Sequence, residues 1–357
     1  MMNRFAVVAA CSVACIASAQ NINPDFGGCY ALRNLGLVPG VPFNYGGIAF
    51  KHDDPDVLLI GGSANNADAK IYAIRVTRDG DGTIDGFVGT ATLFASSPGI
   101  DGGLTYGPGN VLFYSTYSNN NVGQIMPGST APNKVTNMGS VVNPSLGSCQ
   151  FVPAGFPGAG RFKVASYSAN EWADVSISPD GGGTFNIGGV ANSLVPLLPD
   201  GFGIGPEGIV YVQPGNPGIT THSVLISEYS RGSVACYEVD AIGDPIMSTR
   251  RVLISSLSGA EGGTRDPRTG HFMFSTFGGG SNVILVTGFN LNCRPNINGD
   301  CYVDDSDFVL FANSYNILDC ADPSMDVGCP ADFNDDGFVD DTDFVIFALA
   351  YDRLICQ

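Results

Sequence analysis

The sequence is poor in basic residues, and this shortage is the first constraint on its function. Its 357 residues include 16 Lys and Arg against 34 Asp and Glu, which gives a formal net charge of −18. Nucleic-acid binding relies on clustered Lys and Arg that neutralise phosphates, and attraction to an anionic membrane surface relies on the same charges. The composition therefore argues against both kinds of partner.

Histidine is equally scarce, and familiar catalytic patterns are missing. The three histidines, His52, His222 and His271, have none of the spacings of metal ligands, so we expect incidental surface positions. No Gly-x-Ser-x-Gly sequence marks a serine hydrolase. Paired carboxylates for glycoside hydrolysis stay open, because a fold brings distant residues together.

Long apolar runs are missing after the N-terminus. Residues 1–19 carry Arg4, an apolar run and a final Ala-Ser-Ala, which is typical of a secretory signal peptide cleaved after Ala19. A lipoprotein signal ending at Cys11 is an alternative with a shorter apolar run than usual. No later stretch approaches about 18 apolar residues, so we expect an extracellular protein without a membrane span, released or held by a partner.

The last 65 residues contain one pattern written twice at an offset of 36 residues. Residues 296–307 read NINGDCYVDDSD and residues 332–343 read DFNDDGFVDDTD, and each segment opens an amphipathic helical pattern. The cysteines at 293 and 320 recur with the same offset at 329 and 356. The chain therefore ends in a duplicated unit.

Both segments match a calcium loop of about 12 residues, in which positions 1, 3, 5, 7, 9 and 12 supply oxygen ligands and position 6 is glycine. In that order the second loop offers Asp332, Asn334, Asp336, the carbonyl of Phe338, Asp340 and Asp343, with Gly337 at the turn. The first loop offers Asn296, Asn298, Asp300, the carbonyl of Tyr302, Asp304 and Asp307, with Cys301 at the turn. Solvated acidic turns are the alternative. We expect two Ca²⁺ ions, held more tightly by the second loop, because it has more carboxylates.

A helix is expected after each loop and none before it, and position 12 is Asp in both copies. In these features residues 293–357 resemble the type I dockerin family. The resemblance implies antiparallel helices and docking to a cohesin-like or cell-surface protein. It assigns partner recognition to the pairs before the last ligand, Asp305 with Ser306 and Asp341 with Thr342. It also implies the disulfides Cys320–Cys329 and Cys293–Cys356.

Loss of the signal peptide would remove Cys11 and Cys15 and leave eight cysteines, for which we expect disulfides in an oxidising compartment. The sequence does not pair the remaining four, Cys29, Cys149, Cys236 and Cys301. A bond from Cys301 to the preceding domain would fix the turn of the first loop in place of glycine, or tie the two domains together.

Residues 21–292 have a different composition, with many Gly and Pro and short alternating apolar runs. Self-comparison aligns five segments at a step of about 50 residues on one template of three strands, the second ending in Ser-x-aromatic. Acidic hairpins follow some of them, at residues 78–85, 178–185 and 240–245. The hairpin at 78–85 is an alternative calcium loop, but its counterparts lack the ligand series, which favours a turn.

About four strands per unit is typical of a propeller blade. We therefore expect an all-β propeller of about six blades over residues 20–292, with residues 21–42 supplying or completing the sixth. A small α-helical calcium module follows at residues 293–357.

Residues 40–290 resemble the six-bladed propellers of the NHL-repeat and gluconolactonase superfamily. In gluconolactonase-type propellers a Glu-Gly at the start of an innermost strand binds a catalytic divalent metal. Glu207 and Glu261 match it, and Asp101 stands at the equivalent position. The resemblance implies further Asn and Asp ligands that the sequence does not place, since the expected Ser-Asp is Ser227-Glu228. Turn-capping residues or a structural ion are the alternatives.

Aromatic residues recur at the Ser-x-aromatic positions. Tyr117, Tyr167, Tyr229 and Phe277, together with Trp172, would either form a sugar-stacking surface or pack between blades. With no complete catalytic set, we expect a secreted binding or scaffold component of an extracellular, polysaccharide-degrading or cell-surface assembly, with a glycan as one candidate ligand. The alternative is a metal-dependent lactone or ester hydrolase, or a glycan-active enzyme.

Overall fold

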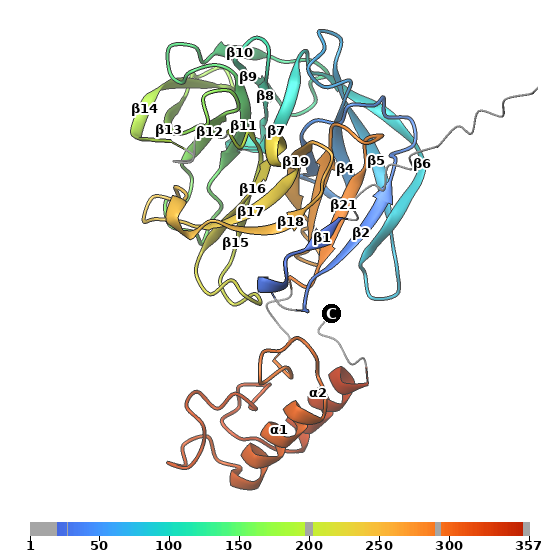
Figure 1. Ribbon diagram of the computed structural model, residues 1–357, viewed down its shortest axis with the longest axis vertical. Helices are drawn as coiled ribbons and strands as arrows, with labels where there is room; N and C mark the ends of the chain where they lie inside the picture. Colours follow the sequence, from blue (N-terminus) through green and yellow to red (C-terminus); the bar gives the residue numbers. More distant parts are fainter. Residues whose placement is uncertain (1–19, 27, 197–202, 290–293, 353–357) are drawn as a thin grey trace, which may run out of the picture.

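The computed structural model describes residues 20–26, 28–196, 203–289 and 294–352. The expected signal peptide, Cys293 and Cys356 lie outside these residues. Figure 1 shows a β-propeller above a small domain with two helices.

Five antiparallel sheets form the blades, each with its innermost strand first. The first blade contains β3 (Ile48–Lys51), β4 (Asp54–Gly62), β5 (Lys70–Arg78) and β6 (Ile84–Ser96). The second contains β7 (Ile100–Tyr106), β8 (Leu112–Thr116), β9 (Asn121–Ile125) and β10 (Lys134–Asn137). The third contains β11 (Leu146–Phe151), β12 (Phe162–Ser166), β13 (Glu171–Pro179) and β14 (Phe185–Pro196). The fourth contains β15 (Pro206–Val212), β16 (Ser223–Glu228), β17 (Ser233–Glu238), β18 (Arg251–Ser255) and β1 (Asn21–Ile22). The fifth contains β19 (Ala260–Arg265), β20 (Phe272–Thr276), β21 (Val283–Thr287) and β2 (Ala31–Gly36).

The prediction of about six blades is wrong, because the N-terminal segment does not form a blade of its own. Strand β2 pairs with β21 as the outer strand of the fifth blade, and β1 extends the fourth blade by pairing with β18. Both ends of the propeller domain therefore share one sheet, which closes the ring. Closure of this kind depends on pairing between distant segments, and strand periodicity alone does not reveal it.

The hydrophobic core lies between neighbouring blades. One cluster joins Leu59 and Ile71 of the first blade to Leu104 and Tyr114 of the second. Strands buried on both faces, such as β8 and β16, read as nearly continuous apolar or small residues for this reason. This packing fixes the innermost strands around a common axis.

The acidic segments are hairpin turns, as predicted. Asp79, Asp180 and Asp240 each donate a backbone hydrogen bond to the carbonyl four residues later, at 2.9, 3.0 and 2.9 Å. Their carboxylates accept amide hydrogen bonds within the same turn. These side chains are thus used to close turns between outer strands.

The C-terminal domain has two helices, α1 (Asp305–Ile317) and α2 (Asp341–Tyr351). Each helix begins with a capping box. In α1 the carboxylate of Asp304 accepts from the amide of Ser306, and the carboxylate of Asp307 accepts from the amide of Asp304. Asp340 and Asp343 do the same in α2. Phe311 and Phe347 are buried between the helices with their ring centroids 5.2 Å apart. No helix in the described part of the chain is long and apolar enough to cross a membrane.

Candidate cation sites in the channel and the C-terminal domain

Three carboxylates meet on the propeller axis. Asp101, Glu207 and Glu261 stand near the starts of β7, β15 and β19, and each keeps only 1–2% of its surface exposed. One oxygen from each lies within 4.8 Å of one from the other two. The structure thus brings together the three residues that the repeat alignment placed at equivalent positions.

The other two blades carry glycine at this level, which leaves room for the carboxylates. A Cβ atom on Gly147 would lie 2.9 Å from Oε2 of Glu207 and collide with the carbonyl of Pro206. A Cβ atom on Gly46 would lie 2.9 Å from the carbonyl oxygen of Asp101. A ring of five side chains would not fit this narrow axis.

Few hydrogen-bond donors reach the three carboxylates. The amide of Gly102 donates to Oε2 of Glu207 at 3.2 Å. Within the described chain, Oδ2 of Asp101 and both oxygens of Glu261 accept no hydrogen bond from a fixed donor. Asn65 follows the second strand of the first blade, and its side chain lies close enough to Asp101 to lower the pKa of that carboxyl. Sequence reasoning missed Asn65, because it lies in a turn outside the repeated template.

Burial raises the pKa of Asp101 to about 7. It also raises the pKa of Glu207 and of Glu261 well above the usual range, and the neighbouring negative charges raise both further. No basic group acts on any of the three among the described residues. The cluster must therefore hold protons or a cation, because three buried carboxylates without a positively charged partner are too costly. An all-oxygen set suits a hard divalent ion such as Ca²⁺, Mg²⁺ or Mn²⁺.

Glu228 takes no part in this cluster. Its oxygens accept hydrogen bonds from Ser233 and Tyr237, each at 2.6 Å, and form an ion pair with Arg250. Ser275, in the corresponding segment of the fifth blade, bonds the carbonyl of Gly46 at 2.6 Å. The Asn and Asp ligands implied by the resemblance are therefore not supplied from these two positions.

The recurrent aromatic residues form a series across four blades. Ring centroids are 5.6 Å apart for Tyr117 and Tyr167, 5.7 Å for Tyr167 and Tyr229, and 6.0 Å for Tyr229 and Phe277. The channel carboxylates raise the pKa of Tyr229 in addition to burial, so the series lies close to them. These rings contact one another from blade to blade and remain half-buried. Trp172 is separate, fully buried, and donates to Asp244.

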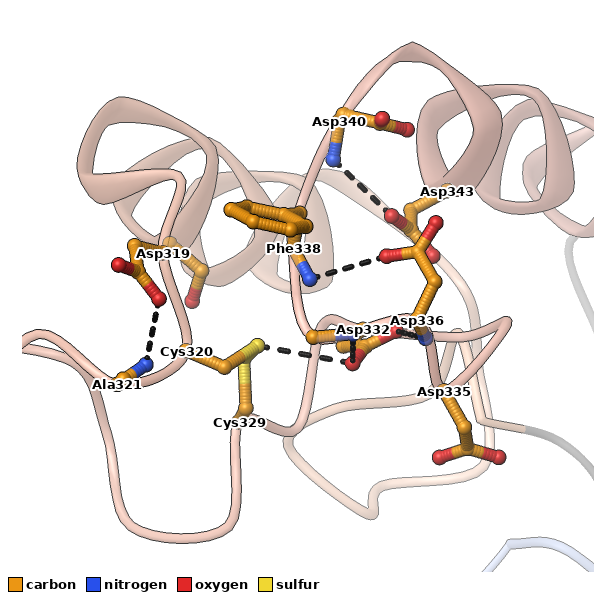
Figure 2. Close-up of a disulfide and its surroundings, with 12 residues drawn as sticks. Asp319, Cys320, Ala321, Cys329, Asp332, Asp335, Asp336, Phe338, Asp340 and Asp343 are labelled. Carbon is orange, nitrogen blue, oxygen red and sulfur yellow. Dashed lines mark hydrogen bonds between the residues drawn. A yellow bond between two sulfur atoms is a disulfide. The ribbon is translucent and has the colours of Figure 1, made fainter.

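In the second loop, the carboxylates gather around backbone amides (Figure 2). Asp332 accepts from the amide of Gly337 at 2.9 Å, and Asp343 from that of Phe333 at 2.7 Å. Asp336 and Asp343 face one another, whereas Asp335 points away and pairs with Arg294. Asp332, Asp336 and Asp343 thus lie close together in the loop, whereas the carboxylate of Asp340 caps α2 by accepting from the amide of Thr342.

The first loop resembles the second in its hydrogen bonds and differs from it at its first residue, Asn296. Asp307 accepts from the amides of Asn298 and Asp304, as Asp343 does in the second loop. The side-chain oxygen of Asn296 is buried and accepts no hydrogen bond within the described chain. Cys301 has φ of 82°, the left-handed conformation that glycine usually supplies at this position.

Two disulfides lie in the described chain. Cys320–Cys329 is present, as the resemblance implied, with Cα atoms 5.4 Å apart. Cys301 is bonded to Cys29, next to the ring-closing strand β2, with Cα atoms 4.9 Å apart. The expectation that all eight cysteines are oxidised is wrong, because Cys149 and Cys236 are buried free thiols in different blades. Burial raises the pKa of both, to about 11 for Cys236, so neither is a nucleophile at neutral pH.

The histidines join no cluster of metal ligands among the described residues. His271 is buried, contrary to the expected surface position, and burial lowers its pKa. His222 bonds the carbonyl of Gly155 at 3.1 Å, and His52 packs against Tyr106.

The helices present a duplicated surface. Tyr315 of α1 bonds Asp341, and Tyr351 of α2 bonds Asp305, which are equivalent contacts at the 36-residue offset. Two hollows of about 400 and 330 Å³ flank the pair. One is lined by Asp305, Phe308, Phe344, Phe347, Ala348, Tyr351 and Asp352. The other is lined by the equivalent residues Asp341, Phe344, Phe308, Phe311, Ala312, Tyr315 and Asn316.

No protein-family model and no curated protein matches this sequence. Among solved structures, the PQQ-bound aldose sugar dehydrogenase of Streptomyces coelicolor is 14% identical, with a TM-score of 0.39 over 71% of this chain and 83% of that one. The pyranose dehydrogenase PQQ domain of Coprinopsis cinerea is 10% identical, with a TM-score of 0.39 over 75% and 97%. The Cps50 β-propeller domain of Myceliophteria thermophila is 9% identical, with a TM-score of 0.36 over 67% and 69%. At this level the similarity concerns the β-propeller fold alone.

Proposed function

We propose that the protein is a secreted, calcium-dependent binding component, docked through its C-terminal domain and presenting the propeller as a rigid platform. The observation that carries this proposal is the duplicated helix pair, whose two equivalent apolar hollows share Phe308 and Phe344. Metal binding contributes folding free energy in so small a domain, so calcium would order the docking surface.

Phe308 and Phe344 are the centre of that surface. Each lines both hollows and is 44% or 43% exposed, which is unusual for a side chain that serves only the core. The repeated pairs Asp305 with Ser306 and Asp341 with Thr342 begin the same helices. A partner with an apolar surface and hydrogen-bond donors, of the cohesin-like kind, fits these groups.

The test is limited proteolysis of the full-length protein, followed by binding to an immobilised type I cohesin domain, in calcium and in chelator. We expect protection of residues 294–352 by calcium, and calcium-dependent binding that Phe308→Asp with Phe344→Asp abolishes. Val327→Asp is the matched control, because Val327 is fully exposed and lines neither hollow. A domain equally protected in chelator would contradict the calcium dependence.

A metal-dependent lactone or ester hydrolase is the second candidate, favoured by the unpaired channel carboxylates. Asp101, Glu207 and Glu261 would hold the ion, which would polarise a carbonyl and activate water. Turnover of lactones or aryl esters with added divalent metals, lost in Glu207→Gln and Glu261→Gln, would establish this function over a purely binding role.

A further inference from the structure

A cavity of about 630 Å³ opens at the end of the channel opposite to the carboxylates. The carboxylates stand near the starts of the innermost strands, whereas this cavity is lined by the ends of all five, β3, β7, β11, β15 and β19, and by the turns that follow. Its volume is in the range of small-molecule sites, about 300–1,000 Å³. It is therefore separate from the cluster described above.

The lining has the opposite charge from the protein. It includes Lys51, His52 and Arg265 and no acidic residue, in a chain with a formal net charge of −18. Lys51 pairs with Asp53 at the rim. Arg265 forms no ion pair within the described chain, and its Nε donates a long hydrogen bond of 3.3 Å to the carbonyl of Gly270. Its guanidinium is thus available to an anionic group.

Apolar rings and neutral donors complete the cavity. Phe50, Tyr106 and Phe156 contribute ring surface, and His52 packs edge-on against Tyr106 at 5.0 Å. The side-chain amide of Gln213 makes no hydrogen bond in the described chain. Such rings suit the C–H face of a sugar, the amide suits hydroxyl groups, and the Arg fork suits a carboxylate.

We infer that this cavity binds a carboxylate-bearing sugar, such as a uronic acid, through Arg265. The sugar could arrive free or as the end of a chain, and the recognition chemistry is the same for both. The site lies on the opposite face of the propeller from the cation cluster and does not depend on it.

The test is calorimetric titration of the full-length protein with D-glucuronate. D-Glucose is the control without a charge, and sulfate is the control without a sugar ring. We expect saturable glucuronate binding that is at least about tenfold tighter than glucose or sulfate binding and weakens with salt. Arg265→Gln should weaken it about tenfold without changing the unfolding midpoint. Arg268→Gln is the control, because Arg268 is a nearby exposed arginine that pairs with Asp56 and does not line the cavity.

Equal affinity for glucose would overturn the role of the carboxylate, and equal affinity for sulfate would overturn the role of the ring. The assignment also fails if glucuronate does not bind, or if both arginine variants lose the same affinity. D-galacturonate and a short oligogalacturonide, titrated in parallel, distinguish a free sugar from a chain end.

Discussion

Cys301, at the turn of the first of the two repeated loops, is bonded to Cys29, two residues before the strand that closes the propeller. The bond joins residues 272 positions apart and holds Cys301 at φ of 82°. One disulfide thus ties the ring closure, the loop and the C-terminal domain together.

We predict that Cys301→Ser and Cys301→Gly will separate the two roles of this bond. Both variants lose the cross-link and should lose about 2–4 kcal/mol of unfolding free energy. Glycine takes the left-handed conformation without strain, whereas serine does so at a cost of about 1 kcal/mol. Calcium affinity of the first loop should therefore be higher in Cys301→Gly than in Cys301→Ser, as measured by calorimetry. Equal affinities would show that the turn is not strained.

The channel cluster predicts a dependence of stability on pH in metal-free protein. The pKa of Asp101 rises from 3.8 to about 7 on folding, so the folded state holds more protons than the unfolded state between these values. Stability should be full below pH ~4 and fall as the pH rises toward 7. Asp101→Asn should flatten this slope in thermal unfolding at several pH values.

A divalent cation should reverse that loss, because it replaces the protons. In an Asp300→Ala, Asp332→Ala background with both C-terminal loops disabled, added Ca²⁺ or Mn²⁺ should still raise the unfolding midpoint at pH 7. A further Glu261→Gln change should abolish the increase. If neither ion has an effect, the cluster is a protonated structural group.

Glycine at positions 46 and 147, the two equivalent positions without a carboxylate, should be required for stability. We predict that Gly147→Ala costs at least about 2 kcal/mol of unfolding free energy, because its Cβ would press on Glu207 and on a backbone carbonyl. Gly189→Ala is the control, since nothing lies within 4 Å of the added atom. Denaturant unfolding compares the two, and equal losses would contradict the packing argument.

Features with a local sequence pattern could be predicted, whereas pairings between distant segments could not. The 36-residue repeat predicted two equivalent loop–helix units, and these fold as matched copies, with Asp307 and Asp343 accepting equivalent backbone hydrogen bonds. The alignment of the repeats also predicted equivalent strand starts for Asp101, Glu207 and Glu261, whose carboxylates meet in the structure. The blade count was wrong because β2 pairs with β21, about 250 residues later in the sequence, and so completes the last blade instead of starting one of its own.

Several site features had no pattern in the sequence. Asn65 lies in a turn without a counterpart in the repeat, and Glu228 turns toward Arg250 because of packing in its own blade. The Cys29–Cys301 bond depends on how the two domains meet, which spacing does not reveal. The cavity near Arg265 arises from five strand ends, none of which has a recognisable motif.

Calcium titration of the intact protein by calorimetry tests the central claim most directly. We predict two-step binding at the C-terminal loops, in which Asp332→Ala removes the tighter step and Asp300→Ala only the weaker one, because the second loop has four carboxylate ligands and the first has three. Two equal steps, or a tighter first loop, would contradict the ligand argument. A titration without heat in the wild-type protein would contradict the proposal that calcium orders the docking domain.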